Sequence, residues 1–258
     1  MSFEVLQGDC LEIMKDIPSG SIDTCITDPP YGTTACSWDA VIPFAPMWEE
    51  LKRIVKANGA IVLFGSQPFS SALVMSNPQM FKYEWIWRKN APTGHLNVKI
   101  KPMLNHESVL VFARGRYTYN PQDTVYYGAL HRRGGQSENY ADYGLENWQE
   151  YANYPRTVVD FDVHRSTAQH PTQKPVELMR YLVRTYTNEG DRVLDFTCGS
   201  GTTGVACAIE RRDCVLIDND AGYCSEAVAR IKRANGIACD VPKRIRGYAP
   251  MPLFESVA

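Results

Sequence analysis

VLDFTCGSGTT, at residues 193–203, is the stretch that decides the fold. Its first residues belong to a short segment, residues 192–195, that is predicted to be a strand. Gly199 and Gly201 follow, and glycines let the backbone approach a ligand closely. A helical segment starts at Thr202, and the first N–H groups of a helix are free to bind such a ligand. The stretch therefore predicts a strand, a Gly-x-Gly turn and a helix start arranged around a ligand.

A second acid stands at the end of the next predicted strand. Asp218 follows Asp195 at roughly the 20-residue spacing at which an acid holds a ribose diol. The turn has only two glycines and no Lys of a phosphate-binding loop. This pattern favours a nucleoside with little or no phosphate over a dinucleotide or a nucleoside triphosphate.

TDPPY, at residues 27–31, is where we expect the chemistry. It follows a β-branched-rich run, residues 21–26, that predicts a buried strand. Its two prolines end that strand, because proline cannot donate to a β-ladder. An acid, a stiff turn and an aromatic ring suit a planar group bearing an NH2: the Asp28 carboxylate and a turn carbonyl accept its two hydrogens, while Tyr31 stacks on it. Taken alone, the stretch also fits an ordinary strand-to-loop turn.

Strands and helices alternate along most of the chain, which is typical of a parallel sheet with helices on both faces. Strands are predicted at residues 3–6, 21–26, 60–64, 83–88, 108–112, 192–195 and 214–218. Helices are predicted at residues 11–17, 44–57, 69–75, 176–186, 202–211 and 221–234. Asn58 and Gly59 are expected to cap the second helix, and residues 60–64 to form a buried parallel strand. Residues 115–169 show no sustained period and predict an insertion of loops and short elements.

Composition bounds the class of protein. The 258 residues are 44% hydrophobic and 22% charged, which is ordinary for a globular chain large enough for one domain with an insertion. No apolar run is long enough to span a bilayer, and the first residues lack the pattern of a signal peptide. None of the eight cysteines forms a C-x-x-C pair, so we expect reduced thiols in a cytoplasmic protein.

The charge distribution is more informative than the net charge of -2. Residues 82–133 hold nine Lys or Arg against three acids, with tryptophan and tyrosine interleaved. This pattern is compatible with a surface that faces phosphates. A mildly basic, solvated face is the plain alternative.

Together these motifs resemble those of S-adenosylmethionine-dependent DNA amino-methyltransferases of the beta arrangement, in which the Asp-Pro-Pro-Tyr half precedes the cofactor half. The similarity covers most of residues 5–114 and 168–232. DPPY at 28–31 matches the catalytic motif, and HPTQKP at 170–175 and GSGTT at 199–203 match cofactor signatures. GDC at 8–10, WRKN at 87–90 and HESVLVF at 106–112 match weaker ones. One departure is Phe196-Thr197, where the family usually has Pro-Phe, and it affects the apolar contact near the methionine end.

The resemblance implies an α/β fold, a Rossmann-like class I methyltransferase domain. Its mostly parallel, seven-stranded sheet would be circularly permuted, so that the N-terminal strand lies beside the strand ending at Asp218. Residues 1–114 would form the catalytic half and 170–236 the cofactor-binding half of one domain. Residues 115–169 would be a target-recognition insertion, and 237–258 a C-terminal tail.

The resemblance also assigns roles to single residues. The catalytic candidates are Asp28, Pro29, Pro30 and Tyr31. The cofactor-binding candidates are Asp9, Thr172, Gln173, Lys174, Asp195, Cys198, Gly199, Gly201, Thr202, Thr203 and Asp218. Of these, Asp9 would lie beside the cofactor adenine, Asp218 would bind the ribose hydroxyls, and residues 172–174 would face the methionine carboxylate and amine, with helix capping as their alternative. The DNA-binding candidates are Arg88, Lys89, Lys99, Lys101, Arg132 and Arg133.

The implied reaction is methyl transfer from S-adenosylmethionine to the exocyclic amine of a base flipped out of double-stranded DNA. No metal and no covalent enzyme intermediate are expected. The sequence has no Pro-Cys dipeptide, so carbon-5 cytosine methylation has no candidate nucleophile. In the family an Asp at the first motif position usually goes with adenine N6 and a Ser with cytosine N4. Asp28 therefore predicts adenine N6, with cytosine N4 as the alternative.

Two readings from other classes stay open at this point. An RNA or protein-amide methyltransferase more often has Asn in place of Asp28. A catalytically silent DNA-binding module is disfavoured by the intact Asp28, Tyr31 and glycine turn. Trp38 and Asp39, in the loop after Tyr31, are interpreted as closing over DNA or as a simple surface loop. A companion restriction endonuclease, a homodimer and a bacterial, archaeal or phage source are compatible with the sequence.

Overall fold

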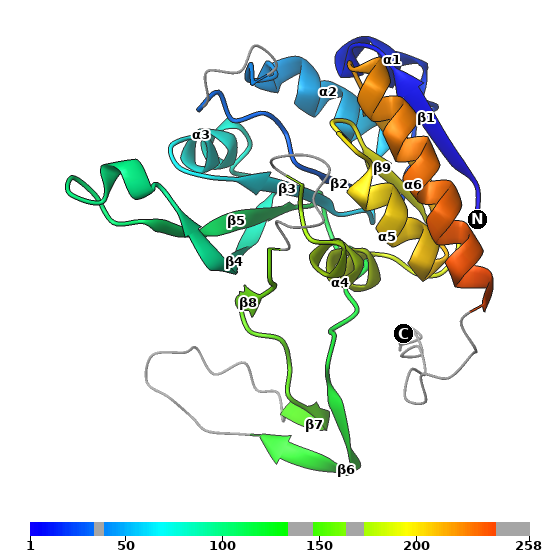
Figure 1. Cartoon of the computed structure of the whole chain (residues 1–258). Helices are drawn as coiled ribbons and strands as arrows, with labels where there is room; N and C mark the ends of the chain where they lie inside the picture. The colour runs from blue at the N-terminus through cyan, green and yellow to red at the C-terminus, as the bar shows by residue number, and fades with distance from the viewer. Residues whose placement is uncertain (34–38, 134–146, 164–172, 241–258) are drawn as a thin grey trace.

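A computed structural model describes residues 1–33, 39–133, 147–163 and 173–240 of the chain, and Figure 1 shows how their elements are arranged. An eight-stranded sheet forms the centre, in the order β1-β10-β9-β2-β3-β5-β4-β8. Its strands are β1 (Phe3–Gln7), β2 (Thr24–Thr27), β3 (Ile61–Gly65), β4 (Phe81–Thr93), β5 (Leu104–Phe112), β8 (Val158–Asp160), β9 (Arg192–Asp195) and β10 (Asp213–Asp218). The first five strands of this order, β1, β10, β9, β2 and β3, are parallel to one another. β5 is antiparallel to both β3 and β4.

The predicted permutation is confirmed by the strand order. β1 pairs in parallel with β10, so that Gln7 lies opposite Asp218. The two predicted halves meet where β2 pairs with β9, with Thr24 opposite Val193. Both halves therefore build one sheet, and its carboxyl edge collects the ends of β2, β9 and β10.

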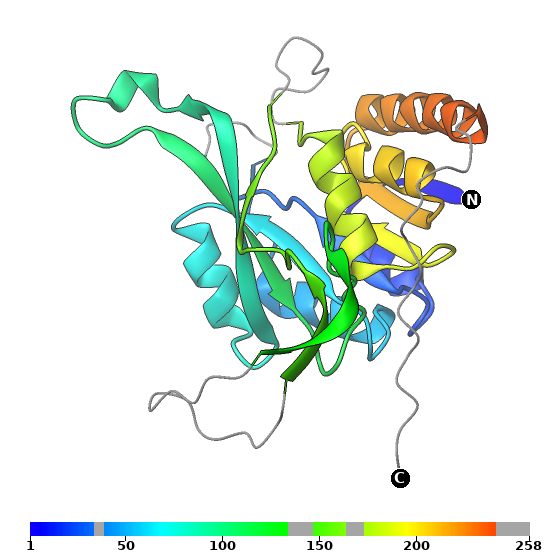
Figure 2. The same ribbon diagram turned by 90° about the horizontal axis from the view of Figure 1, so that it is seen from below.

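Helices cover both faces of the sheet, as the alternation predicts. They are α1 (Cys10–Asp16), α2 (Phe44–Ile54), α3 (Phe69–Ser76), α4 (Val176–Tyr186), α5 (Thr202–Glu210) and α6 (Ala221–Asp240). Figure 2 shows α4, α5 and α6 side by side along one face. Strand side chains alternate between the faces: Ile61 and Leu63 pack with the core under α1 to α3, while Val62 and Phe64 pack with the core under α4 to α6. All five residues of β3 are buried, because both faces are covered.

Three sequence-based predictions, two of helix ends and one of strand direction, need correction. α2 was predicted to run to residue 57 with a cap at Asn58 and Gly59, but it ends at Ile54 and its C-cap is Val55. The reason is that Val55 forms a β-bridge with Ile22, which takes the backbone into the sheet. The strand at residues 60–64 was predicted as parallel, and β3 is parallel to β2 but antiparallel to β5. The helix predicted at 221–234 continues to Asp240.

The seven predicted strands become eight because the insertion returns to the sheet. β8 pairs in parallel with the outer side of β4, with Val158 opposite Ile86. Before it, β6 (Val125–Arg133) and β7 (Asn147–Ala152) pair with each other as a separate two-stranded sheet. Loops and short elements are thus what residues 115–169 form in their described parts, although these parts also build into the main domain.

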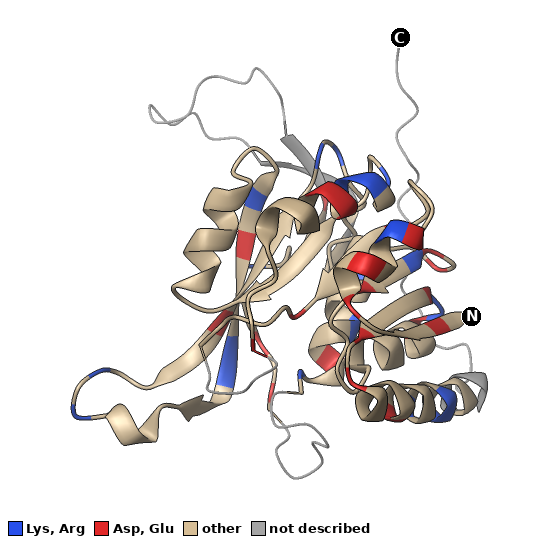
Figure 3. Ribbon diagram, turned by 90° about the horizontal axis from the view of Figure 1, so that it is seen from above, with Lys and Arg blue, Asp and Glu red and all other residues tan. Residues whose placement is uncertain are grey.

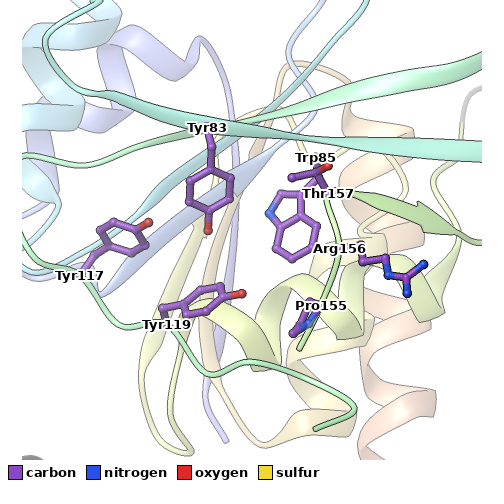
Figure 4. Close-up of a pocket in the computed structure, with 7 residues that line it drawn as sticks. All are labelled: Tyr83, Trp85, Tyr117, Tyr119, Pro155, Arg156 and Thr157. Carbon is purple, nitrogen blue, oxygen red and sulfur yellow. The ribbon is translucent and has the colours of Figure 1, made fainter. Parts of the chain in front are cut away.

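An aromatic cavity marks the place where the insertion joins the sheet (Figure 4). It encloses about 170 Å³, and its lining comprises Tyr83, Trp85, Tyr117, Tyr119, Pro155, Arg156 and Thr157. Two of the lining side chains contact Tyr186 of α4. The Tyr186 hydroxyl lies 2.9 Å from that of Tyr83 and accepts a hydrogen bond of 2.6 Å from the indole of Trp85. Asn120 adds a backbone hydrogen bond to Thr185 of α4, at 2.7 Å. The bond from Asn120 ties the insertion to the end of α4, at the amino edge of the parallel strands and opposite the edge that carries the acids.

Candidate active site

The two sequence motifs meet at the carboxyl edge of the sheet. Asp28 directly follows β2, and Asp195 and Asp218 end the neighbouring strands β9 and β10. The carboxyl ends of parallel strands are where open α/β sheets bind ligands. The structure thus brings together the clamp predicted from the Asp-Pro-Pro-Tyr stretch and the turn predicted from the Gly-x-Gly stretch.

Asp28 is fixed by its neighbours on three sides. Its Oδ1 accepts a hydrogen bond from the Tyr31 hydroxyl at 2.5 Å, and its Oδ2 lies 2.5 Å from the Lys174 ammonium. Its backbone carbonyl accepts a hydrogen bond from the Thr197 hydroxyl at 3.0 Å. The Asp28 side chain is nevertheless 27% exposed, so a substrate can reach it.

The Tyr31 ring is held in an aromatic environment. It stacks on Phe69, with the ring centroids 5.2 Å apart and the planes inclined by 29°. The Lys174 ammonium lies 5.9 Å from the Tyr31 centroid and 5.0 Å from that of Phe64. Ammonium groups at such distances from ring faces are stabilised by the ring quadrupole.

A chain of alternating charges runs behind Asp28. Lys174 lies between two carboxylates, because its Nζ is also 3.0 Å from Oε2 of Glu107. The other oxygen of Glu107 is paired with Lys89. Lys174, Glu107 and Lys89 have side chains only 9 to 13% exposed. Two acids and two bases therefore balance inside the site.

This balance sets the protonation states. Burial raises the pKa of the Asp28 carboxyl, an effect that Lys174 offsets in part and the negative charge of Glu107 increases. Burial also opposes ionisation of Glu107, but Lys174 and Lys89 prevail and lower its pKa. Burial disfavours the charged form of Lys174, yet Asp28 and Glu107 outweigh it and raise the Lys174 pKa. Lys174 consequently stays an ammonium, and the raised pKa gives the Asp28 carboxyl a higher proton affinity than that of an ordinary aspartate.

The charge chain includes two residues with other predicted roles. Lys174 is predicted to face the methionine amine and carboxylate, and in the structure its ammonium pairs with Asp28 and Glu107. Lys89 is predicted to face DNA, and in the structure it is buried against Glu107 and lies 4.9 Å over the Trp87 ring. Glu107 was missed as a site residue, although its motif was recognised. Glu107 comes close to Lys89 because β4 and β5 pair in antiparallel register, with Trp87 opposite Glu107.

Asp195 is a buried support of the turn. Its Oδ1 accepts hydrogen bonds from the Thr27 hydroxyl at 2.6 Å and from the Thr197 amide at 3.2 Å, and its Oδ2 accepts one from the Thr203 hydroxyl at 2.5 Å. Burial raises the pKa of Asp195 to about 6, and the hydrogen bonds oppose that rise. Both oxygens are engaged by the protein itself, so Asp195 shapes the turn and connects it to β2.

Asp218 and the glycine turn are joined directly. The amide of Gly199 donates to Oδ2 of Asp218 at 2.8 Å, and the amide of Asp220 donates to Oδ1 at 2.9 Å. Gly199 has a φ of +49°, and no atom lies within 4 Å of the position that a Cβ there would occupy. The turn is therefore open above Gly199, where a ligand held by Asp218 would lie.

Comparisons with known proteins identify the family. The sequence profile of the DNA methylase family (N6_N4_Mtase) matches residues 22–229, which is most of the chain. The chain belongs to this family.

Its relatives include Type II methyltransferase M.HpaI from Haemophilus parainfluenzae, which is 28% identical over 253 residues and aligns with 90% of this chain and 74% of its own length. DNA adenine methyltransferase YhdJ from Escherichia coli is 24% identical, with 94% of this chain and 87% of YhdJ covered. The M1.HpyAVI–SAM complex has the same fold, with a TM-score of 0.63, 24% identity and coverage of 89% and 98% of the two chains. PvuII DNA methyltransferase, described as cytosine-N4-specific, has a TM-score of 0.68 at 16% identity and coverage of 93% and 92%.

The class I methyltransferase fold predicted from the sequence is thus confirmed for this DNA methylase. Among the described residues, no group of three or more His, Cys, Asp or Glu side chains is arranged to hold a metal ion. The described helices also include none with the length and apolar composition needed to cross a membrane.

The other predicted cofactor residues surround the same turn. Asp9 caps α1, accepting from the Leu11 amide at 2.7 Å, and Gly8 beside it donates to the Asp218 carbonyl at 2.9 Å. Cys198 is buried beneath the turn, and its amide donates to the carbonyl of Ile217 at 2.9 Å. Thr172 lies outside the described residues.

Arg230 of α6 is a further residue of the turn that the sequence did not reveal. Its guanidinium donates to the carbonyl of Ser200 at 2.6 Å and to the Ser200 hydroxyl at 2.7 Å, and lies 3.4 Å from the Thr202 hydroxyl. Ser200 in turn contacts Gln173 at 3.5 Å. Nothing in the periodic pattern of α6 separates Arg230 from its other basic residues, so only the fold identifies it.

The predicted DNA-binding residues occupy different places. Lys99 and Lys101 are exposed in the connection between β4 and β5. Arg88 forms a two-pronged ion pair with Asp160 of β8, at 2.5 and 2.7 Å. Arg132 and Arg133 lie in β6, where the structure describes their backbone pairing with β7.

The loop after Tyr31 is fixed at its base. Both oxygens of Asp39 accept backbone hydrogen bonds, from Gly32 at 2.8 Å and from Thr33 at 2.9 Å. Asp39 thus holds the base of this loop, and Trp38 lies outside the described residues.

Replacing Gly201 with alanine is expected to destabilise the fold and to weaken cofactor binding. Gly201 has a φ of +78°, and a Cβ there would lie 2.5 Å from the Cβ and 2.9 Å from the Cα of Ala227. The strained backbone and the forced shift of α6 together are expected to cost about 2–4 kcal/mol of folding free energy, which thermal or urea unfolding measures. Gly190→Ala is the matched control, because Gly190 has a φ of +88° but open space around it. Equal destabilisation of the two variants, with calorimetric cofactor binding retained in both, would contradict the close packing of the turn.

Proposed function

We propose that this DNA methylase transfers a methyl group from S-adenosylmethionine to the N6 amine of an adenine flipped out of double-stranded DNA. The observation that carries the proposal is the short hydrogen-bonded connection between the clamp and the turn. The Thr197 hydroxyl donates to the Asp28 carbonyl and lies 2.7 Å from the Thr27 hydroxyl, which in turn binds Asp195. The group that accepts the amine thus adjoins the turn that would hold the methyl donor.

The residues of the turn fit the donor. The open space above Gly199 suits a ligand that lies against the backbone, and Asp218 beside it would accept hydrogen bonds from the ribose hydroxyls. Gly199, Gly201 and Asp218 would hold the sugar and methionine portions, with Asp9 near the adenine. When bound there, S-adenosylmethionine supplies an electrophilic methyl group on a sulfonium sulfur.

The residues of the clamp orient the amine. Asp28 and the Pro29 carbonyl accept its two N–H hydrogens, which directs the nitrogen lone pair away from the carboxylate, and Tyr31 stacks on the base. The nitrogen forms a bond to the methyl carbon as the carbon–sulfur bond breaks, and it then sheds one proton. Asp28 is the acceptor within reach, and burial, which raises its pKa, makes it a better base than an ordinary aspartate. Most of the acceleration comes from position and orientation.

The choice of adenine rests on Asp28. Aspartate at this motif position accompanies adenine N6 in the family that the sequence resembles, and the relative YhdJ is a DNA adenine methyltransferase. The fold itself supports either base, because the PvuII enzyme of the same fold is cytosine-N4-specific. Type II methyltransferases among the relatives also support a restriction–modification role with a companion endonuclease acting on DNA in the cytoplasm. A homodimer remains a prediction from the sequence.

Mass spectrometry of nucleosides tests the proposal. Unmethylated plasmid DNA is incubated with the purified protein and S-adenosylmethionine, digested and analysed. We expect N6-methyladenine, and sequencing of the modified positions then gives the methylation site. N4-methylcytosine would overturn the base assignment and keep the mechanism, whereas no modified base in DNA would overturn the function.

A further inference from the structure

An arm projects from the edge of the sheet beside the active site. β4 and β5 continue as a hairpin beyond the pair Trp87 and Glu107, and their last pair is Thr93 with Leu104. On β5, the three residues from Glu107 to Leu104 span about 10 Å at about 3.3 Å per residue, and β4 takes up its extra residues in the irregular register between Arg88 and Thr93. Figure 1 shows it extending past the other strands.

The tip of the arm, residues 94–103, has a defined conformation. A 3-10 turn, His95–Asn97, follows Gly94. The amide of Asn97 donates to the Gly94 carbonyl at 3.0 Å, and the amides of Ile100 and Lys101 donate to the Asn97 carbonyl at 2.9 and 3.0 Å. The backbone of the tip is therefore held by its own hydrogen bonds.

Those side chains are apolar and face solvent. Leu96 is 100% exposed, Ile100 84% and Val98 51%. Three large aliphatic side chains exposed within five residues are unusual for a surface turn and mark a contact with another molecule.

The charge of the arm indicates which kind of molecule its tip contacts. From Arg88 to His106 the sequence contains no acid, and Lys99 and Lys101 alternate with the exposed aliphatic residues. Figure 3 shows the basic positions along the arm and at its tip. Double-stranded DNA matches both the lysines and the aliphatic side chains of the tip. Its phosphates bind ammonium groups, and its base stack accepts inserted aliphatic side chains such as Leu and Ile.

We propose that the tip is a wedge: Leu96 and Ile100 enter the base stack of the duplex next to the target base, while Lys99 and Lys101 hold the flanking phosphates. The arm starts at the charge chain of the active site, because its two strands, β4 and β5, carry Lys89 and Glu107. Insertion replaces stacking contacts that the target base gives up when it flips, so it lowers the cost of flipping. This inference rests on the proposed function.

The test compares two duplexes with the methylation site found by sequencing. One is fully paired, and the other has a mismatch opposite the target base, which makes flipping easier. For the variant Leu96→Ala/Ile100→Ala we expect kcat/KM to fall about 10- to 100-fold on the paired duplex, since unstacking one base involves a few kcal/mol. On the mismatched duplex we expect a loss of less than about threefold. Met75→Ala, which removes an exposed apolar side chain of α3, is expected to match the wild type on both.

Other outcomes overturn the wedge. Unchanged activity of the variant on the paired duplex would contradict the wedge proposal. An equal loss on both duplexes would show that the two side chains contribute to DNA binding in general and not to base flipping. A change of the variant from dimer to monomer in light scattering would assign the tip to self-association. If the wild type methylates no DNA, the proposed function fails instead, whereas a methylating wild type with an unaffected variant rejects the wedge alone.

Discussion

Asp28→Ala is expected to abolish methyl transfer while S-adenosylmethionine still binds. The variant loses the acceptor of the amine hydrogens and of the proton released after transfer, and such groups account for about 10²–10⁴-fold in rate. The turn that would hold the cofactor keeps its own hydrogen bonds through Asp218 and Asp195. Transfer of radiolabelled methyl groups to DNA measures the first effect, and titration calorimetry with the cofactor measures the second.

Asp28→Asn is the matched control for shape. Asparagine keeps one acceptor oxygen but has no negative charge to pair with Lys174 and no proton affinity for the released proton. We expect it to retain cofactor binding and to remain far below the wild type in transfer. Activity near the wild-type level in either variant would contradict the role of Asp28.

Lys174→Met is expected to cause the second-largest loss, and one that depends on pH. Lys174 lies between two carboxylates, and its ammonium opposes the rise that burial causes in the pKa of Asp28. Without it, burial and the repulsion from Glu107 raise the Asp28 pKa further, so a larger fraction of Asp28 is protonated at neutral pH. A protonated carboxyl accepts hydrogens poorly, so the acid limb of the rate profile moves to higher pH. Each unit of that shift lowers the rate about tenfold at a pH below both midpoints.

The pH profile of kcat measures this effect and separates two roles of Lys174. If Lys174 contacts the methionine group, as the sequence predicts, its loss weakens cofactor binding and leaves the acid midpoint unchanged. If it positions Asp28, the midpoint moves and cofactor binding changes little. The double variant Lys174→Met/Glu107→Gln removes the repelling charge as well, and it is expected to bring the midpoint part of the way back. A midpoint that stays at the wild-type pH in Lys174→Met would contradict the tuning of Asp28.

The sequence predicted what is encoded locally. The strand, turn and helix around Gly199 and the turn after β2 are each specified within about ten residues, and both lie where they were expected. Their meeting at one edge followed from the parallel arrangement, because parallel strands point their carboxyl ends the same way. Asp218 at the end of β10 was predictable for the same reason.

What was not predicted depends on pairing between distant segments. Glu107 meets Lys89 through the register of β4 and β5, and it meets Lys174 only after α4 has packed on the sheet. Asn58 and Gly59 have the composition of a helix cap, yet tertiary pairing of Val55 with Ile22 ends α2 earlier. β8 is three residues long and exposes two of them, so its composition carries no strand signal.

The strand order has a consequence for biosynthesis. Among the described strands of the sheet, β1 leaves the ribosome before the others, and its neighbour β10 leaves after all of them. β2 waits in the same way for β9 on one of its sides. The nascent amino-terminal half therefore shows unpaired strand edges until β9 and β10 have been synthesised, and such edges invite aggregation. Translation speed and chaperone supply are accordingly expected to govern the yield of this protein more than its final stability does.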